Sequence, residues 1–68
     1  MSLGENIKKR RIKKGMTQEN LAVEIGIGRS MVAQIERGSK IPNMLLGYEI
    51  ARVFECTMDE LVEGGNPK

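Results

Sequence analysis

The sequence predicts an all-α fold built from five short helices. Apolar residues recur at helical spacing in five segments, and glycines or helix-capping residues separate these segments. No stretch alternates apolar and polar residues with the period of two that a half-buried strand needs. The chain has 68 residues, which is enough for one domain. We place this domain at residues 1–63 and a flexible tail at residues 64–68.

The first two segments are each closed by a glycine. The first runs from about residue 3 to residue 14, and Gly15 is a suitable C-terminal cap. The second opens at Thr17, a good N-cap, and ends at Gly26. The side chains expected to face the core are Leu3, Ile7, Ile12 and Met16 from the first segment, and Leu21, Ala22 and Ile25 from the second.

The other three segments have boundaries of the same kind. The third runs from about residue 28 to residue 37 and is stopped by Gly38, and the fourth begins at Asn43. The fifth opens with Thr57 and Glu60, which have the spacing of a capping box. Core positions are expected at Val32 and Ile35, at Met44, Gly47, Ile50, Ala51 and Phe54, and at Met58, Leu61 and Val62.

Charge divides the chain into a basic and an acidic part. Residues 1–40 hold nine basic and four acidic side chains, whereas residues 41–68 hold two basic and five acidic ones. The overall charge of +2 therefore hides a strongly basic first part. A basic face on a small domain favours phosphate as a partner. The alternative interpretation is a solvated, lysine-rich helix, and charge alone leaves both open.

The absence of certain residues and segments argues against an enzyme, a metal-binding protein, a membrane protein and a secreted protein. It contains no His and a single Cys, so the usual general base is missing, and an internal disulfide or a cysteine zinc site cannot form. No apolar run approaches the roughly 18 residues of a membrane span. No signal-peptide core follows the N-terminus. We expect a cytoplasmic protein that is not an enzyme and binds no metal, cofactor, membrane or small-molecule ligand.

Residues 17–38 carry the most informative pattern. Two short segments are separated by about three residues around Gly26, which allows the left-handed backbone of a sharp turn. Ala22 is small enough for two helices to cross closely. The second segment buries only Val32 and Ile35, which leaves its other sides free. This spacing predicts a helix-turn-helix, and the alternative is an ordinary helical hairpin.

The same residues and several later ones match one known pattern. The matching stretches are TQENLA at residues 17–22, IGI at 25–27, IERG at 35–38, Pro42, Ile50 with Ala51 and Phe54, and MDEL at 58–61. Over about residues 4–62 the chain resembles the phage-repressor/Cro type of helix-turn-helix domain. The resemblance implies a compact five-helix, lambda-repressor-like fold. It also implies sequence-specific binding of double-stranded DNA by a homodimeric regulator, a repressor, associated with the nucleoid.

The resemblance implies a role for individual residues. Base edges in the major groove would be read by Arg29, Ser30, Ala33 and Gln34. Backbone phosphates would be contacted by Gln18, Arg37, Lys40 and Asn43. We therefore expect loss of Gln18 to weaken binding to all sequences alike. Arg11 and Glu36 match a pair that forms an internal ion pair in relatives, and the alternative is two unrelated surface charges.

The chain departs from the family pattern in its fourth segment. Gly47 stands where an apolar side chain is usual and leaves space to be filled, and Leu45 and Leu46 stand where polar residues are usual. We expect a homodimer contact lined by Leu45, Leu46, Met58 and Leu61. The alternative is that Leu46 turns inward to compensate for Gly47.

A second function fits the same fold. The apolar pair in the fourth segment and the acidic second part of the chain also fit a protein-interaction module. Its partner would be a protein such as a toxin or a polymerase subunit. The two functions are distinguished by whether the basic face of the third segment binds DNA in the absence of any partner.

Overall fold

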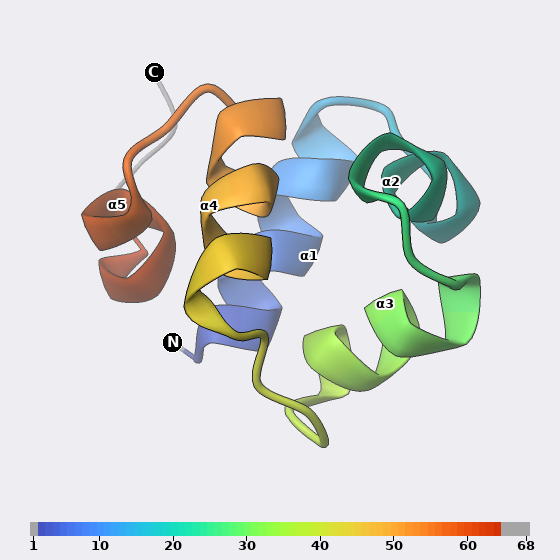
Figure 1. The fold of residues 1–68 in the computed structure, drawn as a ribbon. Coiled ribbons are helices and arrows are strands. Elements are labelled where there is room, and N and C mark those ends of the chain that lie inside the picture. Colours follow the sequence, from blue (N-terminus) through green and yellow to red (C-terminus); the bar gives the residue numbers. More distant parts are fainter. Residues whose placement is uncertain (1, 65–68) are drawn as a thin grey trace.

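Five α-helices make up the computed structural model, which describes residues 2–64. The helices are α1 (Leu3–Lys13), α2 (Gln18–Ile25), α3 (Arg29–Arg37), α4 (Met44–Val53) and α5 (Met58–Glu63). Their main packing contacts run from α1 to α3, α2, α4, α5 and back to α1, so the helices close a ring around one core (Figure 1). No strand is present in residues 2–64, and the predicted all-α, five-helix fold is confirmed.

The helix boundaries follow the local signals in the sequence. Thr17 and Thr57 each begin a helix with a complete capping box, and Asn43 caps α4 through its side chain. A further capping box, at Ser2, begins α1. Gly26 and Gly38 end α2 and α3 in the left-handed conformation, with φ of 73° and 84°. Residues 65–68 of the predicted tail lie outside the described residues.

The core is formed by one or two inner positions from each helix. The buried apolar residues are Ile7, Leu21, Ala22, Val32, Ile35, Ile50, Ala51 and Leu61. All of them were expected at inner positions. They meet where the five helices enclose the centre of the ring, and partly buried residues from every helix and the connecting segments pack around them. This small core holds the helix-turn-helix of α2 and α3 against the other helices.

Three residues expected in the core lie on the surface instead. Ile12, Met44 and Val62 are 58%, 80% and 56% exposed. Ile12 follows Ile7 by five residues, which turns it about 140° away from the buried side of α1. Met44 lies about 120° around α4 from Ile50, and Val62 lies about 100° past the buried Leu61, so each points outward.

The space at Gly47 is occupied by a methionine. A Cβ built on Gly47 would lie 3.2 Å from Met58 Cε, so Met58 of α5 packs where the missing side chain would be. Leu46 is also partly buried and packs against the core, as the alternative interpretation of this segment predicted. Leu61 is only 2% exposed. The expectation that Leu61 lines a dimer contact is therefore wrong, because α5 turns this side chain into the core.

Candidate nucleic-acid interface

The turn between α2 and α3 is short because the first residues after α2 donate backbone hydrogen bonds to its last turn. The Ile27 N–H donates to Ala22 O at 3.0 Å, and Gly26 adopts the left-handed conformation that this closure requires. Gly28 then begins α3 as an N-cap in extended conformation, without a side-chain hydrogen bond. Ala22 is buried in the core, and α2 and α3 pack directly against each other. This geometry is that of a helix-turn-helix.

Helix α3 has a buried side and a polar, exposed side. Val32, Ile35 and Glu36 are buried against the rest of the domain. The predicted base-reading residues Arg29, Ser30 and Gln34 are exposed, Ala33 is half-buried beside them, and Arg37 is exposed as well. The structure therefore brings the four predicted base-reading residues and Arg37 onto the sides of α3 that the core leaves uncovered.

The segment after α3 carries the other predicted phosphate contacts. Lys40 is exposed in the connection between α3 and α4. The side-chain oxygen of Asn43 accepts the Leu46 N–H at 2.8 Å and so caps α4. This cap does not use the side-chain N–H groups of Asn43, which can still donate to a phosphate. The Asn43 side chain therefore has a structural task in addition to the predicted one.

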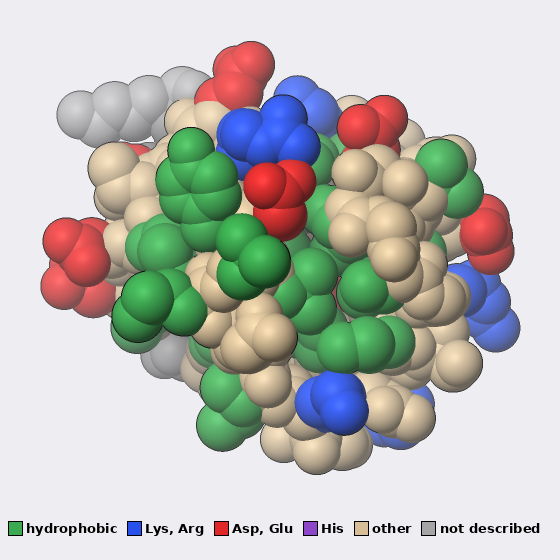
Figure 2. All heavy atoms as spheres, in the orientation of Figure 1, with side chains coloured by type: hydrophobic (Ala, Val, Ile, Leu, Met, Phe, Trp, Pro, Cys, Tyr) green, Lys and Arg blue, Asp and Glu red, His purple; other side chains and the backbone are tan. Residues whose placement is uncertain are grey.

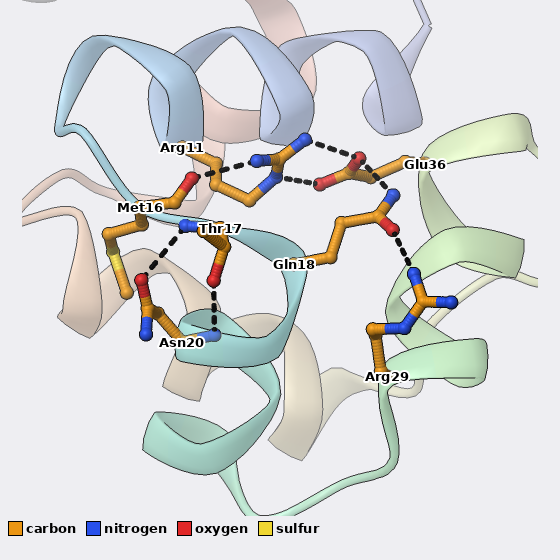
Figure 3. A network of polar contacts seen from close by, with 7 residues as sticks. All are labelled: Arg11, Met16, Thr17, Gln18, Asn20, Arg29 and Glu36. Atoms are coloured by element: carbon orange, nitrogen blue, oxygen red, sulfur yellow. Dashed lines mark hydrogen bonds and ion pairs between the residues drawn. The ribbon is translucent and has the colours of Figure 1, made fainter.

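An ion pair between α1 and α3 lies behind this surface. Arg11 Nε donates to Glu36 Oε2 at 2.7 Å, and Arg11 Nη2 donates to Glu36 Oε1 at 3.2 Å (Figure 3). Arg11 Nη1 also donates to the backbone oxygen of Met16 at 2.7 Å. The two side chains are only 10% and 3% exposed. The pair predicted from the sequence is thus present as a bidentate contact, and it ties α3 to α1 and to the segment before α2.

Gln18 extends this contact to the exposed face of α3. Its Nε2 donates to Glu36 Oε1 at 3.1 Å, and its Oε1 accepts from Arg29 Nη1 at 3.1 Å (Figure 3). The amide orientation follows from chemistry, because the opposite one would place oxygen against a carboxylate and N–H groups against a guanidinium. Sequence reasoning missed this bridge, since its ends lie 18 and 11 positions from Gln18.

Among the described residues there is no metal site, no reactive cysteine and no membrane-spanning helix. No group of three or more His, Cys, Asp or Glu side chains in residues 2–64 is arranged to hold a metal ion. Burial raises the pKa of the Cys56 thiol, which keeps it protonated at neutral pH and a poor nucleophile. Over the same residues, none of the helices has the length and apolar character needed to cross a bilayer.

Comparisons with known proteins agree with this geometry. A helix-turn-helix family model matches residues 7–61. An uncharacterized HTH-type transcriptional regulator of Archaeoglobus fulgidus is 42% identical over 55 residues, which are 81% of this chain and 79% of that protein. The fold is similar to that of the P22 c2 repressor in complex with a synthetic operator, with a TM-score of 0.90 and 28% identity over 96% of this chain and 98% of that one.

A second solved structure is similar in the same way. SinR, described as the master regulator for biofilm formation and solved in complex with DNA, matches with a TM-score of 0.80 and 27% identity. The match covers 87% of this chain and 95% of that one. The family model spans most of the chain, so the resemblance found in the sequence is confirmed. The chain belongs to the helix-turn-helix family and has the fold of the phage-repressor type of domain.

Proposed function

We propose that this protein is a transcriptional regulator that binds double-stranded DNA by placing the exposed face of α3 in the major groove. The observation that carries the proposal is the arrangement of Arg29, Ser30 and Gln34 on the uncovered side of a helix whose other side is anchored in the core. The similar P22 c2 repressor and SinR structures contain DNA. We propose that binding represses transcription and that the protein acts in the cytoplasm, on the DNA of the nucleoid.

The residue types on this face match known base contacts. A guanidinium reads guanine through O6 and N7, and a glutamine amide reads adenine through N6 and N7. Arg29 and Gln34 would supply these contacts, and the half-buried Ala33 would meet a thymine methyl group. Arg37 and Lys40 lie at the end of α3 and just after it, where positive charge would meet the flanking phosphates.

Substitution on this face is expected to separate base contacts from phosphate contacts. Arg29→Ala and Gln34→Ala should each cost about 1–3 kcal/mol of discrimination at one base position. Lys40→Ala should weaken binding to all sequences alike. It should also reduce the slope of log binding constant against log salt concentration by about one unit. The operator is first selected from a random duplex pool at roughly 150 mM salt, where counterion-driven binding is suppressed. Binding is then titrated against single-base variants at several salt concentrations.

Two results would contradict the proposal. A pool that stays random would mean that the basic face only adheres weakly to phosphate. Equal losses on the selected operator and on random DNA for both Arg29→Ala and Gln34→Ala would remove the base-reading role. In either case the alternative function, binding of a protein partner, would remain. It would be tested with substitutions of the exposed apolar residues Met44 and Leu45 of α4.

We further propose that two copies associate through this apolar surface. Ile41, Met44, Leu45 and Tyr48 lie within eight residues of one another and are 81%, 80%, 72% and 55% exposed. Figure 2 shows hydrophobic side chains gathered over α4 on this face. The surface follows Lys40 directly in the chain, so a second copy bound here would lie beside the proposed DNA contacts. An apolar surface also suits a two-fold contact, in which a patch meets itself.

Placing a charge on this surface is expected to separate the two copies. The wild-type protein should have twice the 7.6 kDa mass of the single chain in solution or on its operator, and Leu45→Asp should remain a monomer. Association should weaken roughly a thousandfold, because burying a leucine is worth about 2 kcal/mol and counts twice in a two-fold dimer. Sedimentation equilibrium with and without operator measures the mass.

The matched control is Val23→Asp, which places the same charge on α2 at a residue that is 70% exposed. This variant should associate like the wild type. Two results would contradict the proposed dimer. The wild type could bind its operator as a monomer, or Leu45→Asp could have the same mass in solution as a dimeric wild type. The remaining predicted contacts, Leu46 and Met58, are partly buried and would contribute only at its edge.

A further inference from the structure

A small apolar hollow lies between the start of α1 and the end of α3. Its volume is about 190 Å³, and its apolar walls are the side chains of Leu3, Ile35 and Ile41. Gly4 and Gly38 also line it, and a Cβ built on Gly38 would meet no atom within 4 Å. A cavity of about 150 Å³ already holds a benzene ring, so this hollow has room for one aromatic side chain.

The hollow is continuous with the exposed apolar surface of α4. Ile41 lines the hollow and is also 81% exposed next to Met44, Leu45 and Tyr48. A stable contact buries about 800 Å² on each partner, whereas even an aromatic side chain buries only about 150–250 Å². Four side chains that are already partly covered within one copy do not reach this area. The proposed dimer contact therefore needs more apolar surface, and the hollow supplies it beside Ile41.

Tyr48 is the side chain that matches the hollow. The chain has one Tyr, one Phe and no Trp. Phe54 is partly buried and packs against the core, so Tyr48 is the aromatic residue left exposed. Aromatic anchors that fill pockets dominate the energy of many interfaces. A tyrosine joins an apolar ring to a polar tip, and the polar side chains of Ser2 and Lys40 line the hollow together with its apolar walls.

We propose that Tyr48 of each copy inserts into the hollow of the other, so that two anchors related by the two-fold axis hold the dimer together. This inference rests on the proposed association of two copies, and it adds the residue and the cavity that fix the contact. Lys40 lines the same hollow. The anchor would therefore hold the connection between α3 and α4 that carries this proposed phosphate contact.

Substitution of Tyr48 tests the anchor. Tyr48→Ala should raise the dissociation constant of the dimer roughly a thousandfold, because the burial of a large apolar side chain is lost twice. Tyr48→Phe keeps the ring and should stay within about thirtyfold, since it loses at most one hydrogen bond per copy. The matched control is Met44→Ala on the same surface. It should stay within about tenfold, because contacts around an anchor are nearly neutral. Sedimentation equilibrium measures all four proteins.

A second measurement locates the ring directly. Half of the chains carry ¹³C-labelled Ile and Leu methyl groups and the other half are unlabelled, so filtered NOE spectra report only contacts between copies. The ring signals are unambiguous because the chain has a single Tyr. The Tyr48 ring protons should show NOEs to the methyl groups of Leu3 and Ile35 of the other copy. These two residues are diagnostic because they line the hollow but do not belong to the exposed surface of α4.

The outcomes separate this inference from the proposed dimer. A Tyr48→Ala dimer as tight as the wild type, or ring NOEs to Leu45 with none to Leu3 or Ile35, would overturn the inference and leave the dimer intact. NOEs from operator protons to the methyl groups of the hollow would assign it to DNA and overturn the inference in the same way. A wild type that stays monomeric with and without operator would overturn both.

Discussion

Glu36→Leu is expected to lower the free energy of unfolding by about 3–5 kcal/mol, because it leaves a buried guanidinium without its carboxylate. Arg11 is 10% exposed in its side chain and makes both of its charged hydrogen bonds to Glu36. Gln18 loses the same partner. A domain of this length has a total stability of roughly 3–10 kcal/mol, so the variant should lose between about a third and all of its stability. Urea unfolding followed by circular dichroism measures the change.

Removing both charges should be far less harmful than removing one. The double variant Arg11→Met/Glu36→Leu fills the same volume with apolar atoms and leaves neither charge of the pair buried without its partner, so its stability should return to within about 1 kcal/mol of the wild type. Arg52→Ala is the surface control, because Arg52 pairs with Glu49 in an exposed i,i+3 contact, and its unfolding midpoint should stay close to that of the wild type. A Glu36→Leu midpoint as high as that of Arg52→Ala would refute the buried role.

The features of the fold that could be predicted from the sequence are local ones. A capping box needs only residues three positions apart, so Thr57 and Glu60 could be paired without knowing the fold. The left-handed turns at Gly26 and Gly38 are equally local, because glycine adopts this conformation at low cost. The boundaries of the five helices follow from such signals, and with them the helix-turn-helix itself.

The errors arose where tertiary packing decides the direction of a side chain. Apolar type alone put Ile12, Met44 and Val62 in the core, although helical geometry turns them outward once the anchor residues of each helix are fixed. Leu61 was assigned to a dimer contact, but α5 buries this residue and exposes its neighbour Val62. The exposed apolar side chains of α4 are a better basis for that contact than the predicted set.

Two polar features were invisible in the sequence because their partners are distant. Asn6 is buried, and its Nδ2 donates to Leu61 O at 2.9 Å and to Val62 O at 3.2 Å, which caps the end of α5. These partners lie 55 and 56 positions away, so nothing near Asn6 signals the contact. The bridge from Glu36 through Gln18 to Arg29 is hidden for the same reason. The sequence could predict a polar, exposed side of α3, but not the hydrogen bonds that join these side chains to one another.

Gly4→Ala is expected to destabilise the domain by about 3 kcal/mol, although alanine is normally the better helix residue. Gly4 is buried in α1, and a Cβ there would lie 2.4 Å from Ile35 O and 2.6 Å from Glu36 O. Both atoms belong to the backbone of α3, so a rotamer change cannot relieve the clash and the two helices must move apart. The melting temperature should fall by about 12–24 °C, given roughly 4–8 °C per kcal/mol for a domain of this size.

Gly47→Ala is the matched control, since it is the same substitution at another buried helical glycine. Its Cβ would meet only Met58 Cε, the flexible end of a side chain, at 3.2 Å. The gain in helix propensity of about 1 kcal/mol should therefore exceed the cost of shifting this methyl group, and the melting temperature should rise. Equal effects of the two substitutions would show that close approach of α1 to α3 is not required. If they differ as expected, the contact that brings Arg11 to Glu36 depends on the absence of a side chain at Gly4.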